Sequence, residues 1–208
     1  MIDGTLGYIC TVPMIYEPFV TSLVQLVQYN QAKGINVWYN RTTIGSQAIA
    51  RNDLVKQMRG DWLFFLDTDI VLPCNSLEKL LEILNKNNID VLSGIYYQRQ
   101  APHSPIVYHS EDEEIWNYNP NFHQSEIVPV FAVGGGCLLV RRKVFDRIKK
   151  ELNEEPFDII ASSGEDISFC RRLKKLNIPI YGTNQIKVGH LSLQPITEST
   201  FQKKAWES

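Results

Sequence analysis

Several motifs that would assign the chain to a well-known class of enzyme are missing from its sequence. There is no phosphate-binding loop of the form G-x-x-x-x-G-K-[ST], and no G-x-G-x-x-G follows the first predicted strand. These absences argue against a kinase-like NTPase and against a dinucleotide-dependent enzyme. Internal repeats and low-complexity tracts are also absent, and 44% hydrophobic with 21% charged residues is typical of an ordinary globular protein.

The sequence also lacks membrane, secretion and strong charge signals. No apolar stretch is long enough to span a bilayer, and the N-terminal residues show no signal-peptide pattern. A net charge of only −2 points neither to nucleic acid nor to an anionic membrane. The four cysteines, at Cys10, Cys74, Cys137 and Cys170, form no C-x-x-C pair, and three of the four lie in apolar segments. We therefore expect a cytoplasmic protein in a reducing compartment, with a peripheral membrane contact left open.

Strand and helix patterns alternate over about the first ninety residues. Short apolar runs predict four strands, in "LGYICTV", "INVWYN", "DWLFFL" and "IDVLSG". Helices are predicted over about 18–33, over about 45–58, and after a capping box formed by Asn75 and Glu78. This alternation predicts an α/β fold with a parallel sheet covered by helices on both faces.

The second half of the chain is less regular. Residues 95–129 are rich in Tyr, Pro, His, Asn and acidic residues, and predict a long functional loop or lid. Next, "VPVFAVGGGCLLVRR" predicts one strand interrupted by glycines. A helix in "SSGEDISFCRRLKKLN" and short strands in "IPIYG" and "IKVGHL" complete the predicted elements.

Two aspartates, Asp67 and Asp69, directly follow the buried strand "DWLFFL". Ligands of open α/β sheets bind beyond the carboxyl ends of the strands, where two such carboxylates can meet a hard cation. A polar strand-to-helix turn with Asx-type hydrogen bonds is the competing interpretation, because D-x-D is a common triplet.

Three other polar positions have both a structural and a chemical interpretation. Glu165 and Asp166 fall in the first turn of a helix, where Ser162 and Glu165 have capping-box spacing, yet a carboxylate there also suits a general base. His190 is either a hydrogen-bonded packing residue or the nitrogen ligand in a site for Mn²⁺ or Mg²⁺.

Glycines and a basic residue near the predicted site also allow two interpretations. Gly134, Gly135 and Gly136 indicate a bulge, a bend or close approach of the backbone to a ligand. Arg51 is a solvated helix residue unless its helix face looks into a cleft, where a guanidinium would suit a phosphate.

The order of these segments resembles a GT-A-fold glycosyltransferase of the family-2-like type. The segments are "YICTVPMIYE", "IARNDLVKQMRGDWLFFLDTDIVLP", "VGGGCLLVRRKVFDRI", "GEDISFCRRLKKLNIPIYG" and "VGHL". The resemblance implies a GT-A, Rossmann-like, mostly parallel sheet flanked by helices, with a smaller mixed-sheet region on the acceptor side. It implies a single catalytic domain over 1–208, with 1–93 as the nucleotide-sugar half and 94–208 as the acceptor half.

The implied activity is a metal-dependent hexosyl transfer from a UDP- or GDP-sugar to an acceptor hydroxyl, with Mn²⁺ or Mg²⁺ as cofactor. The resemblance implies that Thr11, Val12 and Pro13 line the nucleotide base and ribose pocket. It places Arg51 near the nucleotide or its diphosphate, Asp69 on the metal, and Asp67 nearer the ribose or a metal-bound water.

The remaining implied roles lie in the second half of the chain. Gly135 and Gly136 would let the donor sugar or acceptor approach the backbone. Asp166, with Glu165 beside it, would supply the catalytic base or position the acceptor, and His190 would be a further metal ligand. The chain would be close to a minimal catalytic core.

Three alternatives to glycosyl transfer stay open: a nucleotidyltransferase, a metal-dependent phosphodiester hydrolase, and a non-catalytic binding protein that has kept the fold. Aromatic residues in the long excursion are either an acceptor platform or packing residues: Tyr96, Tyr97, Trp116 and Tyr118.

Overall fold

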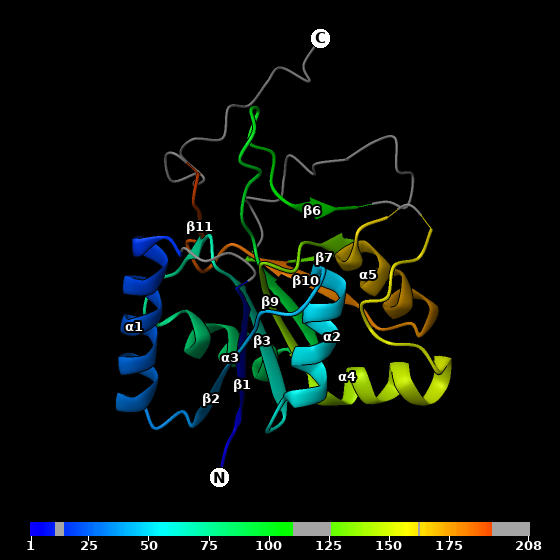
Figure 1. Ribbon diagram of the computed structural model, residues 1–208, viewed down its shortest axis with the longest axis horizontal. Coiled ribbons are helices and arrows are strands. Elements are labelled where there is room, and N and C mark those ends of the chain that lie inside the picture. Colours follow the sequence, from blue (N-terminus) through cyan, green and yellow to red (C-terminus); the bar gives the residue numbers. More distant parts are fainter. Residues whose placement is uncertain (11–14, 110–125, 162, 193–208) are drawn as a thin grey trace.

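The structure is a computed structural model, which describes residues 1–10, 15–109, 126–161 and 163–192. Within these residues the dominant element is a seven-stranded sheet of order β2-β1-β3-β9-β5-β10-β7 (Figure 1). The strands are β1 (Gly4–Ile9), β2 (Val37–Thr42), β3 (Trp62–Asp67), β5 (Val91–Gly94), β7 (Ile127–Val130), β9 (Cys137–Arg141) and β10 (Ile180–Thr183).

Most strands of this sheet share one direction. β1 is parallel to β2 and to β3, and β10 is parallel to β5. β9 lies antiparallel between β3 and β5, and β7 is antiparallel to β10. The expected mostly parallel sheet is therefore confirmed, with β9 and β7 as the two reversed strands.

Helices cover both faces of the sheet, as the alternating pattern predicts. α1 and α3 lie on one side, and α2, α4 and α5 lie on the other (Figure 1). Their bounds are α1 (Glu17–Ala32), α2 (Gln47–Gln57), α3 (Ser76–Lys86), α4 (Arg142–Arg147), the π-helical turn η2 (Ile148–Leu152) and α5 (Glu165–Lys175).

β3 shows why its sequence is a continuous apolar run. Leu63 and Phe65 belong to one buried cluster, with residues of α2, α4 and α5, while Phe64 and Leu66 belong to the other, with residues of α1 and α3. A strand covered on both faces has no solvent side, so successive residues are all apolar. Only at Asp67, where the strand reaches the edge of the sheet, does the chain become polar.

Two short ribbons lie beside the large sheet. β4 (Ile70–Val71) pairs antiparallel with β11 (Gly189–His190), which sets His190 opposite Ile70, next to the D-T-D triplet. The second ribbon pairs β6 (Val107–Tyr108) with β8 (Ala132–Val133).

The prediction of one strand in "VPVFAVGGGCLLVRR" is wrong. The segment forms three strands: β7 at the sheet edge, β8 in the small ribbon, and β9 in the middle of the sheet. Gly134, Gly135 and Gly136 lie between β8 and β9. The glycine run therefore separates strands that belong to different sheets.

Two predicted capping boxes are also wrong. Asn75 precedes α3 without a side-chain cap, and Glu78 instead accepts a hydrogen bond from Tyr29 and pairs with Lys33. The N-cap of α5 is Gly164, so Glu165 is the first residue of the helix and not the third, which a capping box requires. Both glutamates form tertiary contacts, which in these positions replace the local bond.

Two expectations about the chain as a whole agree with the described residues. Cys10, Cys137 and Cys170 are free and buried, and Cys74 is free and half-buried. In the described part of the chain, no helix combines the length and apolar character that a bilayer crossing requires.

Candidate functional site

The carboxyl edge of β3 gathers residues from distant parts of the chain. Asp67 is the last residue of β3, and its backbone N–H donates to the carbonyl of Gly136 at 3.0 Å. Asp69 follows in the turn toward β4, and its carbonyl accepts from the N–H of Leu191 at 2.7 Å. The D-T-D triplet is thus held by the glycine segment on one side and by the β11 region on the other.

Arg51 is buried against Asp67 and is not the solvated helix residue that one interpretation predicted. Its side chain is only 2% exposed, and its Nη2 donates to both carboxylate oxygens of Asp67, at 3.2 and 3.3 Å. Its Nη1 donates to the carbonyl of Gly135 at 3.0 Å, and its Nε donates to Glu165 Oε1 at 3.3 Å. One guanidinium therefore joins β3, the glycine segment and α5 through its planar set of donors.

The charges of this cluster depend on one another. Burial would lower the pKa of Arg51, but the carboxylates of Asp67, Asp166 and Glu165 raise it above its usual value. Burial raises the pKa of Asp67, and burial together with Asp166 raises that of Glu165; in both cases Arg51 opposes the rise. Arg51 is the cation that keeps these buried carboxylates compatible with a folded protein.

Asp69 has different neighbours from Asp67, namely His190 and the exposed Arg99. Its Oδ2 lies 3.4 Å from His190 Nε2 and 3.3 Å from Arg99 Nη1. Burial pulls the pKa of Asp69 upward, but the hydrogen bond and charge of His190 and the charge of Arg99 outweigh burial and lower it. Asp69 is therefore an ionised carboxylate that faces an imidazole and an exposed guanidinium.

The orientation of His190 matters for what this pair can bind. Its Nδ1 lies 2.6 Å from the carbonyl oxygen of Tyr97, so Nδ1 carries the proton and donates it there. In the neutral ring Nε2 then has a lone pair, which faces Asp69 Oδ2. Two electron-pair donors at this distance need a proton or a cation between them. A backbone carbonyl on the far nitrogen is also how histidine ligands of metals are usually oriented.

The glycine segment is shaped by its own neighbours. A Cβ on Gly135 would lie 2.5 Å from the guanidinium carbon of Arg51, and one on Gly136 would lie 2.9 Å from the hydroxyl of Tyr96. That hydroxyl also accepts a hydrogen bond from the Gly136 N–H, at 3.0 Å. Close packing of Arg51 and Tyr96 against the backbone accounts for the glycines without a ligand.

Glu165 and Asp166 are neighbours in the first turn of α5 with different surroundings. Glu165 is 8% exposed and bonded to Arg51. Asp166 is half-buried, and its Oδ2 accepts from the Gly135 N–H at 3.0 Å. Within the described residues no hydrogen bond is formed by its Oδ1.

Comparison with known proteins decides the family. The sequence profile of glycosyl transferase family 2 matches residues 21–149 of this chain, more than half of its length. The chain belongs to this family. The matched part contains Arg51, both aspartates of the triplet and the three glycines, and stops before α5 and β11.

A solved structure supports the same fold for nearly the whole glycosyltransferase. A crystal structure of GalNAc-T7 with UDP, GalNAc and Mn²⁺ matches it with a TM-score of 0.63 at 12% identity. The match covers 90% of this chain and 43% of the other, so this chain spans less than half of the neighbour's length. No curated protein sequence matches the chain. The GT-A fold that the sequence resemblance implied is confirmed.

Not all of the predicted site residues come together. Thr11, Val12 and Pro13 lie outside the described residues. Asp69 and His190 meet, whereas both oxygens of Asp67 accept hydrogen bonds from Arg51. In the described ranges, no three His, Cys, Asp or Glu side chains form a group that could hold a metal ion.

Sequence reasoning missed Arg99 and the part played by Tyr96. Tyr96 and Tyr97 are 5% and 4% exposed, so they pack in the interior and do not offer an open platform; Trp116 and Tyr118 fall outside the described residues. The apolar run "DVLSGIYY" continues past the end of β5 into the site and was the available signal for Tyr96. A single arginine in a polar loop gives no comparable signal for Arg99.

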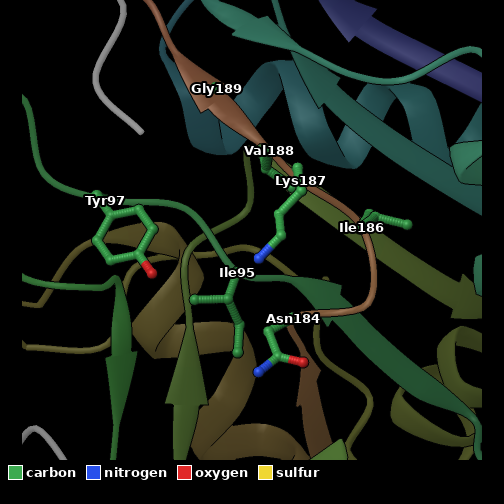
Figure 2. Close-up of a pocket in the computed structure, with 7 residues that line it drawn as sticks. All are labelled: Ile95, Tyr97, Asn184, Ile186, Lys187, Val188 and Gly189. Carbon is green, nitrogen blue, oxygen red and sulfur yellow. The ribbon is translucent and has the colours of Figure 1, made fainter. Parts of the chain in front are cut away.

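Two hollows are lined by chain neighbours of His190 in the glycosyltransferase. One, of about 60 Å³, is lined by Ile95, Tyr97, Asn184 and residues 186–189, with the Lys187 side chain reaching toward Ile95 (Figure 2). The other, of about 470 Å³, lies between α1 and residues 71–73, and Gly189 and Leu191 also line it. The first holds only a few water molecules, and the four site carboxylates line neither.

Proposed function

We propose that this family 2 glycosyltransferase moves a hexose from a UDP- or GDP-sugar to an acceptor hydroxyl, with Mn²⁺ or Mg²⁺ as cofactor. The observation that carries the proposal is the pair of Asp69 Oδ2 and His190 Nε2, 3.4 Å apart, with Nδ1 of the imidazole bonded to the Tyr97 carbonyl. This is an oriented oxygen and nitrogen donor pair beyond the carboxyl end of a central strand, where ligands of such sheets bind.

The donor set fits one divalent cation. Asp69 and His190 would be its protein ligands, and a mixed oxygen and nitrogen set favours Mn²⁺ over Mg²⁺. Both carboxylate oxygens of Asp67 accept hydrogen bonds from Arg51, so Asp67 would contact the ribose or a metal-bound water near the cation. When bound, the cation would act as a Lewis acid on the leaving diphosphate, whose negative charge grows as the glycosidic bond breaks.

Asp166 is the proposed general base. Its Oδ2 is fixed by the Gly135 N–H, while its Oδ1 is open toward an acceptor hydroxyl, which must lose its proton during transfer. Glu165 is the positioning residue of the pair, because its hydrogen bond to Arg51 fixes the first turn of α5 relative to β3. This assignment suits an inverting transfer.

The donor-binding part of the proposal has less direct support. Thr11, Val12 and Pro13 would line the base and ribose pocket within 1–93, and Gly135 and Gly136 would lie near the sugar or acceptor within 94–208 of a single domain. Arg51 would serve the donor site by fixing Asp67. GalNAc-T7, in its crystal structure with UDP, GalNAc and Mn²⁺, supports a nucleotide and a divalent cation as ligands. Four free cysteines support the expected cytoplasmic location.

Incubation of the protein with a panel of sugar nucleotides tests the proposal. We expect hydrolysis or transfer of one sugar nucleotide with Mn²⁺ and loss of this activity with EDTA. Release of a nucleoside monophosphate or cleavage of a plain phosphodiester would support a nucleotidyltransferase or hydrolase. Metal-independent turnover would contradict the cofactor assignment, and the absence of both turnover and nucleotide binding would contradict the proposal.

A further inference from the structure

Arg99 occupies a position at Asp69 that matters for the proposed cation. Its Nη1 contacts Oδ2, the same carboxylate oxygen that faces His190 Nε2. The Arg99 side chain is 49% exposed and that of Asp69 is 21% exposed, so the ion pair borders solvent. Ion pairs between such side chains contribute little to stability.

The loop that carries Arg99 is tied to the same histidine. The N–H of Ile106 donates to the Tyr96 carbonyl at 2.8 Å, and the N–H of Gln98 donates to the Ser104 carbonyl at 2.9 Å. The Tyr97 carbonyl, between these two bonds, accepts from His190 Nδ1. The segment that carries Arg99 thus also orients the imidazole of His190, which comes from β11, and both side chains face Asp69.

A divalent cation and a guanidinium compete for one carboxylate oxygen. In the protein without metal, Asp69 is a partly buried anion, and Arg99 supplies a positive charge beside it, on the same oxygen that faces His190. A cation held by Asp69 and His190 would supply two positive charges at the same oxygen, which removes the attraction for Arg99 and replaces it with repulsion.

We propose that the Arg99 guanidinium takes the place of the divalent cation at Asp69 and that cation binding displaces it. This competition sets the cation concentration at which the metal site becomes occupied. The proposal rests on the proposed function, because it needs Asp69 and His190 to bind a cation. Arg99 lies outside the D-x-D triplet and outside the motifs that flank it.

Direct Mn²⁺ binding, measured by the electron paramagnetic resonance signal of free Mn²⁺, tests the proposal without any turnover. The variants are Arg99→Gln, which removes the charge, and Arg99→Lys, which keeps it. The matched control is Arg147→Gln, which removes another exposed arginine that is paired with a carboxylate, Glu151. Thermal melts of each variant verify that it is folded.

We expect Arg99→Gln to bind Mn²⁺ about two- to fivefold more tightly than wild type, which corresponds to the loss of one exposed ion pair. Arg99→Lys and Arg147→Gln should stay close to wild type. If wild type binds Mn²⁺ and Arg99→Gln binds it equally or more weakly, the competition is overturned while the proposed function stands. If wild type binds no Mn²⁺, either alone or with UDP or GDP, the proposed function fails and this inference fails with it.

Discussion

The two aspartates of the D-T-D triplet are each paired with an arginine, but the two pairs differ in kind. Asp67 is paired with Arg51, which is 2% exposed and has two further partners, the Gly135 carbonyl and Glu165. Asp69 is paired with Arg99, which is 49% exposed and extends from a loop. The first aspartate of the triplet is therefore part of a buried hydrogen-bond network, whereas the second is paired with an exposed loop residue and is the proposed metal ligand.

This division continues in α5. Glu165 belongs to the buried half, through Arg51, and Asp166 belongs to the open half, with one oxygen fixed by a backbone N–H. The two acidic residues of each motif meet different neighbours because Glu165 and Asp166 are rotated by about 100° from each other around α5, and because Asp69 lies in the turn beyond the end of β3. The predictions below test whether substitutions around Arg51 and substitutions around Asp69 and Asp166 have different effects on stability and activity.

The largest effect is expected for Arg51→Met. Removing Arg51 leaves the half-buried carboxylate of Asp67 and the buried carboxylate of Glu165 without compensation, and breaking a buried ion pair in this way typically costs about 3–5 kcal/mol. Urea unfolding measures the loss directly, with Arg99→Gln as the matched control at the open pair. A loss below about 1 kcal/mol for Arg51→Met would mean that Arg51, like Arg99, contributes little to stability. The difference between the two ion pairs would then be wrong.

The second prediction separates the two carboxylates of α5. We expect Asp166→Asn to lower kcat by about 10²- to 10⁴-fold, as for loss of a general base, with nucleotide binding and stability unchanged. Glu165→Gln should instead lower stability, because it removes the charge that faces Arg51, and should affect kcat less. Steady-state kinetics with the active sugar nucleotide, together with nucleotide titration, provides both readouts. Equal kcat losses in the two variants would contradict the assignment of the base to Asp166.

The sequence was informative where a local pattern determines the structure. The apolar run of β3 and its abrupt end at Asp67 predicted a buried strand with carboxylates at the sheet edge, and this is confirmed. The order of the motifs likewise predicted the family and the fold. Local patterns of this kind are formed by residues close in sequence, and burial on both faces leaves a direct signature.

The hydrogen bond between Arg51 and Glu165, 114 residues apart, was not predicted from the sequence. Asp69 and His190, 121 residues apart, were expected to meet only because the family resemblance implied that both bind one metal. Arg51 belongs to a helix that buries polar side chains, including Asn52, so the usual assignment of polar residues to the solvent side misplaces it. The contact between Arg99 and Asp69 depends on the path of a loop, which no periodicity encodes.

A third, smaller effect is expected for Gly135→Ala. A Cβ at this position would lie 2.5 Å from the guanidinium carbon of Arg51, so the buried pair must shift, at a cost of about 1–3 kcal/mol for overpacking. Gly164→Ala is the matched control, because there the nearest atom, Asp166 Oδ1, would be 3.7 Å from the Cβ. Chemical denaturation of both variants measures the difference. Equal stability of the two would mean that the glycine segment is not held against Arg51.

The smallest effect on stability is expected at the open pair. Arg99→Gln should change the free energy of unfolding by less than about 1 kcal/mol, since the ion pair with Asp69 borders solvent. Whatever difference remains at low ionic strength should vanish in 1 M salt, where the screening length falls to about 3 Å. Arg147→Gln, at the exposed pair with Glu151, should behave in the same way in parallel urea titrations at both salt concentrations. A salt-insensitive loss of 2 kcal/mol or more in Arg99→Gln alone would make Arg99 a second framework arginine, and Asp69 would then no longer be the ligand-facing aspartate.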